Sequence, residues 1–109
     1  MVRNTPPARH VIHTVGPIWR GGTAGEPAIL ANCYRSCLAI ARESGFRAIA
    51  FPAIATGVYG FPREQAAQIA VAAVLLHLGR DELPETVIFA CFDAATGEAY
   101  RAALAGRAN

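Results

Sequence analysis

Short apolar segments alternate with longer helix-like segments along the chain, and this order constrains the fold more than any other feature of the sequence. The short segments predict strands at 10–15, 47–52 and 86–92. The longer segments predict helices at 26–44, between Pro62 and Gly79, and from Asp93 to about Ala105. Such an order is typical of a parallel sheet with helices packed on its faces and joined by right-handed crossovers. We therefore predict an α/β fold with about three parallel strands and three helices.

Residue spacing and turn signals locate the helices. Apolar residues at spacings of three and four define one face of the first helix: Ile29, Leu30, Cys33, Cys37, Leu38 and Ala41. Thr23 and Glu26 predict a capping box at its start, and Gly45 predicts its C-cap. Pro62 suits the first position of the second helix and Gly79 the position just past its end. The Ala- and Leu-rich segment between them predicts a buried helix.

The predicted strands indicate where a ligand would bind. The strand at 86–92 has no polar alternation after its first residue, which predicts that both of its faces are covered. Asp93 is expected to cap the helix that follows. Ligands of parallel sheets bind beyond the carboxyl ends of the strands. The site is therefore expected around Gly16, around 55–61 and around Phe92 and Asp93.

Size and composition exclude several classes of protein. A chain of 109 residues, 53% hydrophobic and 17% charged, is expected to form a single compact domain rather than a disordered segment. Its formal net charge of +2 favours neither a nucleic-acid groove nor a membrane anchor. We find no targeting signal or bilayer-spanning run, and expect a cytoplasmic protein. An odd number of cysteines argues against a disulfide framework, and Cys33 and Cys37 are expected in the core rather than on zinc.

The segment 55–62 is the most informative about function, because it follows a predicted strand and leads directly into a predicted helix. Gly57 and Gly60 allow a sharp turn that points successive backbone N–H groups inward, toward the positive end of the helix dipole. This predicts an anion site made of main chain, although a turn without a ligand fits the spacing equally well. Tyr59 could close over a sugar or pack on its neighbours.

The remaining candidates are expected to have structural roles. His13 lies within a predicted strand and suits a satisfied structural histidine better than a general base. Trp19 is either a cover for the helix below or part of a ligand rim, and we favour packing. Arg63 and Glu64 are expected to form a solvated first turn. No catalytic constellation is evident around His10, His77 or Cys91.

Three segments together, 10–19, 51–62 and 91–93, closely resemble the macro domain, above all its bacterial O-acetyl-ADP-ribose deacetylase branch. The resemblance implies a three-layer α/β/α fold whose partners are ADP-ribose, O-acetyl-ADP-ribose or an ADP-ribosylated protein. It implies a diphosphate held by 55–59, Tyr59 over the distal ribose and Phe92 beside the adenine. We expect no metal and no cofactor. The ligand-binding residues expected from the resemblance are Ala55, Thr56, Gly57, Val58, Tyr59, Gly60 and Phe92, with alanine at 55 where related sequences often have serine.

Motifs that the resemblance would also require do not occur in residues 1–109. They are an acidic residue that recognises adenine, an Asn-Ala-Ala-Asn segment, and a glycine-rich loop with a catalytic Asp. We therefore expect a C-terminal part of a macro domain without catalytic residues, inactive as a hydrolase by itself. The alternatives are a binding module without catalysis and a non-functional product of a misassigned start. The resemblance further implies that 10–15 and 47–52 are not neighbouring strands, and the open sheet predicts self-association.

Overall fold

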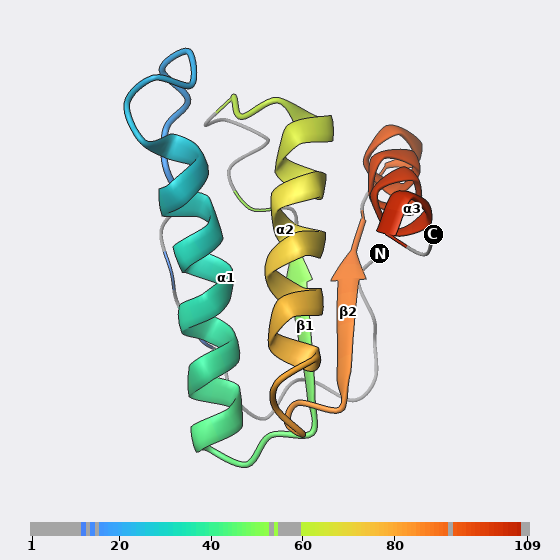
Figure 1. Ribbon diagram of the computed structural model, residues 1–109. Coiled ribbons are helices and arrows are strands. Elements are labelled where there is room, and N and C mark those ends of the chain that lie inside the picture. Colours follow the sequence, from blue (N-terminus) through green and yellow to red (C-terminus); the bar gives the residue numbers. More distant parts are fainter. Residues whose placement is uncertain are drawn as a thin grey trace.

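The computed structural model describes residues 12, 14, 16–52, 54, 60–91 and 93–107. These residues form α1 (Glu26–Glu43), β1 (Ala48–Pro52), α2 (Arg63–Leu78), β2 (Thr86–Ala90) and α3 (Ala94–Arg107), shown in Figure 1. The predicted α/β class and its three helices are confirmed, with two described strands rather than about three. Most of the strand predicted at 10–15 lies outside the described residues. The prediction that this strand does not neighbour β1 therefore stays a prediction. Ile12 and Thr14, which are described, belong to no strand.

Helix α1 has the predicted bounds to within a residue, but its inner face differs from the prediction. Ile29 is 45% exposed, whereas Tyr34, absent from the predicted stripe, is 1% exposed. The helix ends as Gly45 predicts: this residue has φ +75, and the Phe46 N–H returns to the Ala41 carbonyl at 2.9 Å. A left-handed residue after the last turn is a common way to satisfy the final carbonyls.

Helix α2 packs between α1 and α3 (Figure 1). Its buried face consists of small side chains: Ala66, Ala67, Ala70, Val71, Ala73 and Val74. The prediction of a buried helix holds for this face, while Leu75 and Leu76 are 40% and 49% exposed. Pro62 is the N-cap rather than the first helical residue, and Gly79 follows the last helical residue as predicted. Gly79 has φ −76, so the backbone there does not require glycine.

Strands β1 and β2 are parallel and pair in register from Ala48 with Thr86 to Pro52 with Ala90. Alternate residues point to opposite faces of a strand. Phe51 is buried and Phe89 half-buried on the face that the helices cover. On the other face Ala50 is exposed and Ile88 is 52% exposed. The prediction that the last strand is covered on both faces is therefore wrong for the described residues, because all three helices pack on one side of the sheet.

A chain of aromatic side chains joins the sheet to α1 and α3. The Tyr34 ring lies 4.8 Å from that of Phe51, and the Phe89 ring lies 4.7 Å from that of Tyr100. The two tyrosine hydroxyls meet at 3.4 Å in the core. Burial, reinforced by Tyr100, raises the pKa of Tyr34 far above its usual range, and burial also raises that of Tyr100. Both hydroxyls therefore stay protonated and share a hydrogen bond, which offsets the cost of removing them from water.

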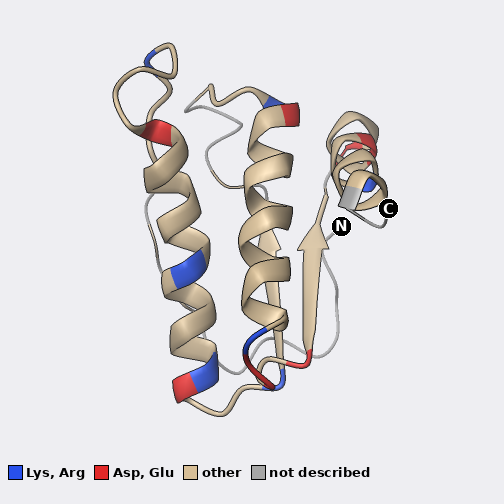
Figure 2. Cartoon of the chain, in the orientation of Figure 1, with Lys and Arg blue, Asp and Glu red and all other residues tan. Residues whose placement is uncertain are grey.

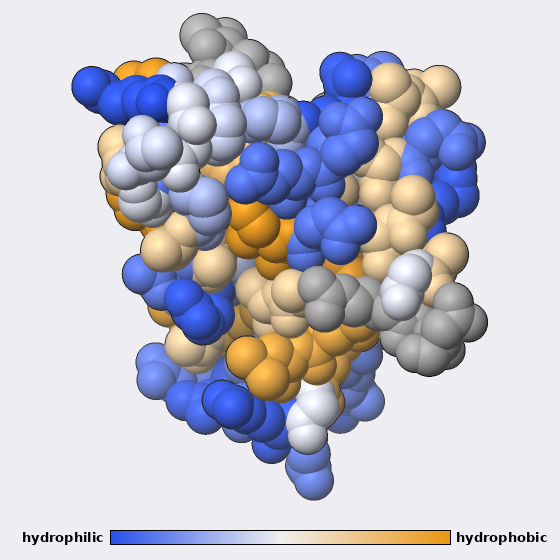
Figure 3. Space-filling model, turned by 45° about the horizontal axis from the view of Figure 1, so that its top comes forward, coloured by the Kyte–Doolittle hydropathy of each residue, from blue (hydrophilic) through white to orange (hydrophobic). Residues whose placement is uncertain are grey.

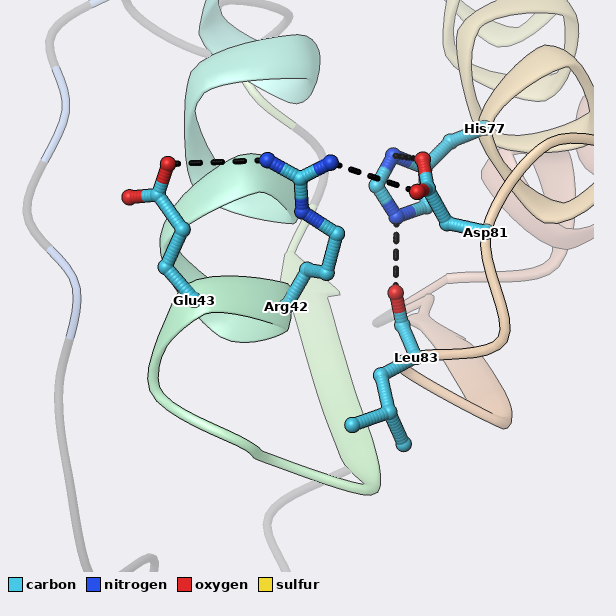
Figure 4. Close-up of polar contacts among 5 residues, drawn as sticks. All are labelled: Arg42, Glu43, His77, Asp81 and Leu83. Atoms are coloured by element: carbon cyan, nitrogen blue, oxygen red, sulfur yellow. Dashed lines mark hydrogen bonds and ion pairs between the residues drawn. The ribbon is translucent and has the colours of Figure 1, made fainter.

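Most charged residues lie at helix ends and connections, with Arg35 in the middle of α1 as an exception, and both strands are uncharged (Figure 2). One polar cluster joins the C-terminal ends of α1 and α2 (Figure 4). The Asp81 carboxylate lies 3.2 Å from Arg42 Nη1 and 3.6 Å from His77 Nδ1. The other ring nitrogen of His77 lies 2.9 Å from the Leu83 carbonyl. His77, for which no constellation was predicted, thus holds the connection from α2 to β2.

Candidate functional site

The carboxyl ends of β1 and β2 lie at one edge of the sheet, and the N-termini of all three helices are at the same end of the molecule (Figure 1). This edge is where a parallel sheet with right-handed connections binds its ligands. The described residues that form it come from three segments: the loop before α1, the end of the 55–60 segment, and the start of α3. The polar cluster around His77 lies at the opposite end.

Most of the ligand-binding residues expected from the resemblance lie outside the described residues. These are Ala55, Thr56, Gly57, Val58, Tyr59 and Phe92, and His10 and His13 also lie outside them. Gly60 is described: it is exposed and has φ +76. A left-handed conformation favours glycine, as expected if the chain turns sharply just before α2. The convergence of backbone N–H groups between 55 and 60 stays a prediction.

The residues on either side of the 55–59 segment are held by buried aromatic contacts. On its N-terminal side, the Ile54 backbone N–H donates a hydrogen bond to the Tyr34 hydroxyl. On its C-terminal side, Phe61 is 2% exposed, and its ring centroid lies 4.8 Å from that of Trp19 at an interplanar angle of 56°. The packing role that we favoured for Trp19 is confirmed, since the indole is half-buried against the core. Ile54 and Phe61, which flank the segment, are thus each held by a contact with an aromatic residue.

The starts of α2 and α3 are tied together by side chains. Arg63 Nε donates to the Thr96 hydroxyl at 3.1 Å, and the Thr96 backbone N–H donates to Asp93 Oδ1 at 2.7 Å. Asp93 therefore caps α3 as predicted, and the Thr96 hydrogen bonds lower its pKa. Arg63 is exposed, but its bond to Thr96 means that the first turn of α2 is more than a solvated face.

Among the residues that the structure describes, no side-chain hydrogen bond caps α2. The first backbone N–H groups of any α-helix lack an acceptor within the helix, and the helix dipole makes that end partly positive. Helix α2 therefore presents donors at the edge of the sheet directly after Gly60 and Phe61. This geometry suits an anion held by main chain.

The loop before α1 is organised by a buried carboxylate, which the sequence prediction missed. The Glu26 side chain, in a residue only 2% exposed, accepts hydrogen bonds from the backbone N–H groups of Arg20 at 2.6 Å, Gly22 at 3.0 Å and Ala24 at 2.8 Å. Its own backbone N–H, together with these three, lowers the pKa of Glu26 from 4.5 to about 2, against the opposing effect of burial. The predicted capping box is wrong: Gly25 is the N-cap, without a side-chain bond.

The described residues hold neither a metal-binding cluster nor a membrane-spanning helix. No group of three or more His, Cys, Asp and Glu residues there could hold a metal ion. Cys33 and Cys37 lie in the core as predicted, and burial raises the pKa of Cys37. None of the described helices is long and apolar enough to cross a bilayer.

The fold and the edge together define an α/β protein whose donors at one end of a parallel sheet suit an anionic ligand. A family model described as the macro domain matches residues 3–70, more than half of the chain. The chain belongs to the macro domain family, as the resemblance indicated.

Two relatives show the closeness of the match. A macro domain-containing protein of Mesorhizobium japonicum is 52% identical over 99 residues, which are 91% of this chain and 56% of the relative. An O-acetyl-ADP-ribose deacetylase of Salmonella gallinarum is 55% identical over 93 residues, 85% of this chain and 52% of the relative. The chain thus spans about half the length of the curated relatives it matches.

Solved structures agree with the family. A variant of the Oceanobacillus iheyensis macrodomain with ADPR superposes with a TM-score of 0.83 at 34% identity, covering 88% of this chain and 51% of that one. The Trypanosoma brucei macrodomain in complex with ADP-ribose superposes with a TM-score of 0.75 at 35% identity, covering 84% and 38%.

Proposed function

We propose that this chain binds ADP-ribose at the carboxyl edge of its sheet. The observation that carries the proposal is the superposition on macrodomains solved with ADPR and with ADP-ribose. The fixed positions of Ile54 and of Gly60 and Phe61, on either side of the 55–59 segment, support it independently.

In this proposal the backbone N–H groups of 55–60 hold the diphosphate, next to the N-terminus of α2. Backbone donors and the helix dipole together favour two adjacent negative charges without requiring a lysine or a metal ion. Tyr59 covers the distal ribose and Phe92 lies beside the adenine. Since the diphosphate contacts come from main chain, alanine at position 55 is compatible with binding.

We further propose that the 109-residue polypeptide binds without hydrolysing O-acetyl-ADP-ribose. Ester hydrolysis requires groups that orient the attacking water and the ester. The resemblance assigns these groups to an Asn-Ala-Ala-Asn segment and a glycine-rich loop, and neither motif occurs in residues 1–109. The deacetylase activity named for the Salmonella relative would therefore need those groups from elsewhere.

The test is calorimetric titration of the 109-residue polypeptide with ADP-ribose, compared with Gly57→Ala and with Gly106→Ala. A methyl group at position 57 restricts the turn and should weaken binding by about tenfold, equivalent to about 1.4 kcal/mol. Gly106 lies in α3 with nothing within 4 Å of an added Cβ, so it is the matched control and should leave affinity unchanged.

Incubation of the same samples with O-acetyl-ADP-ribose should release no more acetate than the buffer does. Absence of ADP-ribose binding by the unsubstituted chain would refute the binding proposal. Acetate release above that of the Gly57→Ala variant would refute the proposal that the polypeptide is inactive.

A further inference from the structure

The Trp19 indole lies where the loop before α1 meets the residues that follow the 55–59 segment. Its ring packs on Phe61 with centroids 4.8 Å apart. A Cβ added to Gly22 would lie 2.8 Å from the far edge of the indole, and one added to Gly60 would lie 3.9 Å from the Trp19 Cβ. The indole is therefore in close contact with its own loop on one side and with Phe61, two residues before α2, on the other.

The loop that carries Trp19 is held in one conformation by Glu26. Three backbone N–H groups, from Arg20, Gly22 and Ala24, converge on its carboxylate. Gly22 contributes in two ways. Its backbone N–H donates one of these bonds, and because it has no side chain, it leaves room for the indole. Its φ of +89 also favours glycine at this position. A carboxylate accepting several backbone donors is a strong constraint, because each bond is charge-assisted.

We infer that Trp19 is a positioning residue for Gly60 and Phe61, which adjoin the proposed phosphate-binding segment, and that the Glu26 carboxylate holds the loop of Trp19 in place. This inference rests on the proposed function and assigns to it two residues outside the phosphate-binding segment. The physical reason is preorganisation: fixing Gly60 and Phe61 before binding reduces the conformational entropy lost when a diphosphate binds beside them. Without the indole, Gly60 and Phe61 would have to be ordered on binding, at the expense of affinity.

The experiment measures ADP-ribose affinity for the full chain and for Trp19→Ala, Trp19→Phe and Glu26→Gln. Trp19→Ala should raise Kd about tenfold, while Trp19→Phe, which keeps a ring against Phe61, should stay within about threefold. Glu26→Gln keeps the indole but presents a neutral amide to three N–H donors, and should raise Kd about threefold or more.

Val71→Ala is the matched control for a loss of stability alone. Val71 is fully buried in α2, so the substitution lowers the melting temperature without touching the edge of the sheet. It should leave Kd unchanged at a temperature where circular dichroism shows every variant folded.

Tryptophan fluorescence gives a readout that a purely structural role would not move. The chain has one tryptophan, so its emission reports on Trp19 alone. ADP-ribose should change that emission with the same Kd that calorimetry gives, and Glu26→Gln should shift the emission of the free protein to longer wavelength. Binding by the full chain with Kd unchanged in Trp19→Ala and Glu26→Gln, and no response of the emission to ligand, would overturn the inference and leave the proposed function intact. A full chain that does not bind overturns both.

Discussion

At the scale of single residues, the interactions that fix this molecule are hydrogen bonds between groups far apart in sequence. Tyr34 meets Tyr100 across 66 positions and also binds the Ile54 backbone N–H. Glu26 reaches back over six positions to Arg20. The spacing of apolar residues does not predict such bonds. It indicates which face of a helix is buried, but not which partner the polar group of a buried side chain will bind.

Glu26 should make the stability of the chain depend on pH in a defined direction. Its pKa is lowered from 4.5 to about 2 in the folded protein, so the unfolded chain takes up a proton first as the pH falls. The stabilisation is therefore complete above pH 4.5 and is lost as the pH falls toward 2. Urea unfolding of the wild type and of Glu26→Gln at several pH values measures this. The difference in free energy of unfolding between the two proteins should become smaller as the pH falls. A constant difference from neutral pH to pH 2.5 would contradict the stabilising role of the ionised carboxylate.

At the scale of elements, local signals located the helices well and the cap of α1 poorly. Periodicity gave the bounds of α1 and Gly45 gave its end, since both act within a few residues. The capping box was mistaken because Thr23 and Glu26 have the right spacing, whereas the Glu26 carboxylate binds the loop instead. Of the expected ligand-binding residues, only Gly60 can be compared with the structure, and its positive φ agrees with the predicted turn.

The two glycines at helix ends should respond differently to alanine. Gly45 has φ +75 and nothing within 4 Å of an added Cβ, so Gly45→Ala should lower the free energy of unfolding by about 1 kcal/mol through backbone strain alone. Gly79 has φ −76, and Gly79→Ala should leave stability unchanged or raise it by about 0.5 kcal/mol. Urea denaturation compares the two variants. Equal losses of stability at both positions would contradict the argument from backbone conformation.

At the scale of the whole molecule, the three described helices cover one face of the two-stranded sheet and leave the other bare. Figure 3, which turns the carboxyl edge toward the reader, shows hydrophobic surface among polar side chains. Among the described residues, the exposed large hydrophobic side chains are Ile18, Ile29, Ile40, Leu75, Leu76, Leu78, Ile88 and Leu104. The sequence could not predict that one face of the sheet is left uncovered by the helices. An apolar strand indicates that both of its faces suit burial, but it does not indicate which element covers each face.

The bare face of the sheet should make the chain associate with itself. Ile88 is 52% exposed in the middle of β2, next to exposed Ala50 of β1, and both strands are uncharged. Uncharged apolar sheet surface is a recurrent site of association, and a charge placed within it opposes contact. Sedimentation velocity should therefore show species larger than the monomer at high concentration, and Ile88→Glu should shift the distribution toward monomer. Leu104→Glu, at a residue 42% exposed on α3, is the control and should leave the distribution unchanged. If both substitutions act equally, net charge and not the sheet face governs association, because only Ile88 lies on that face.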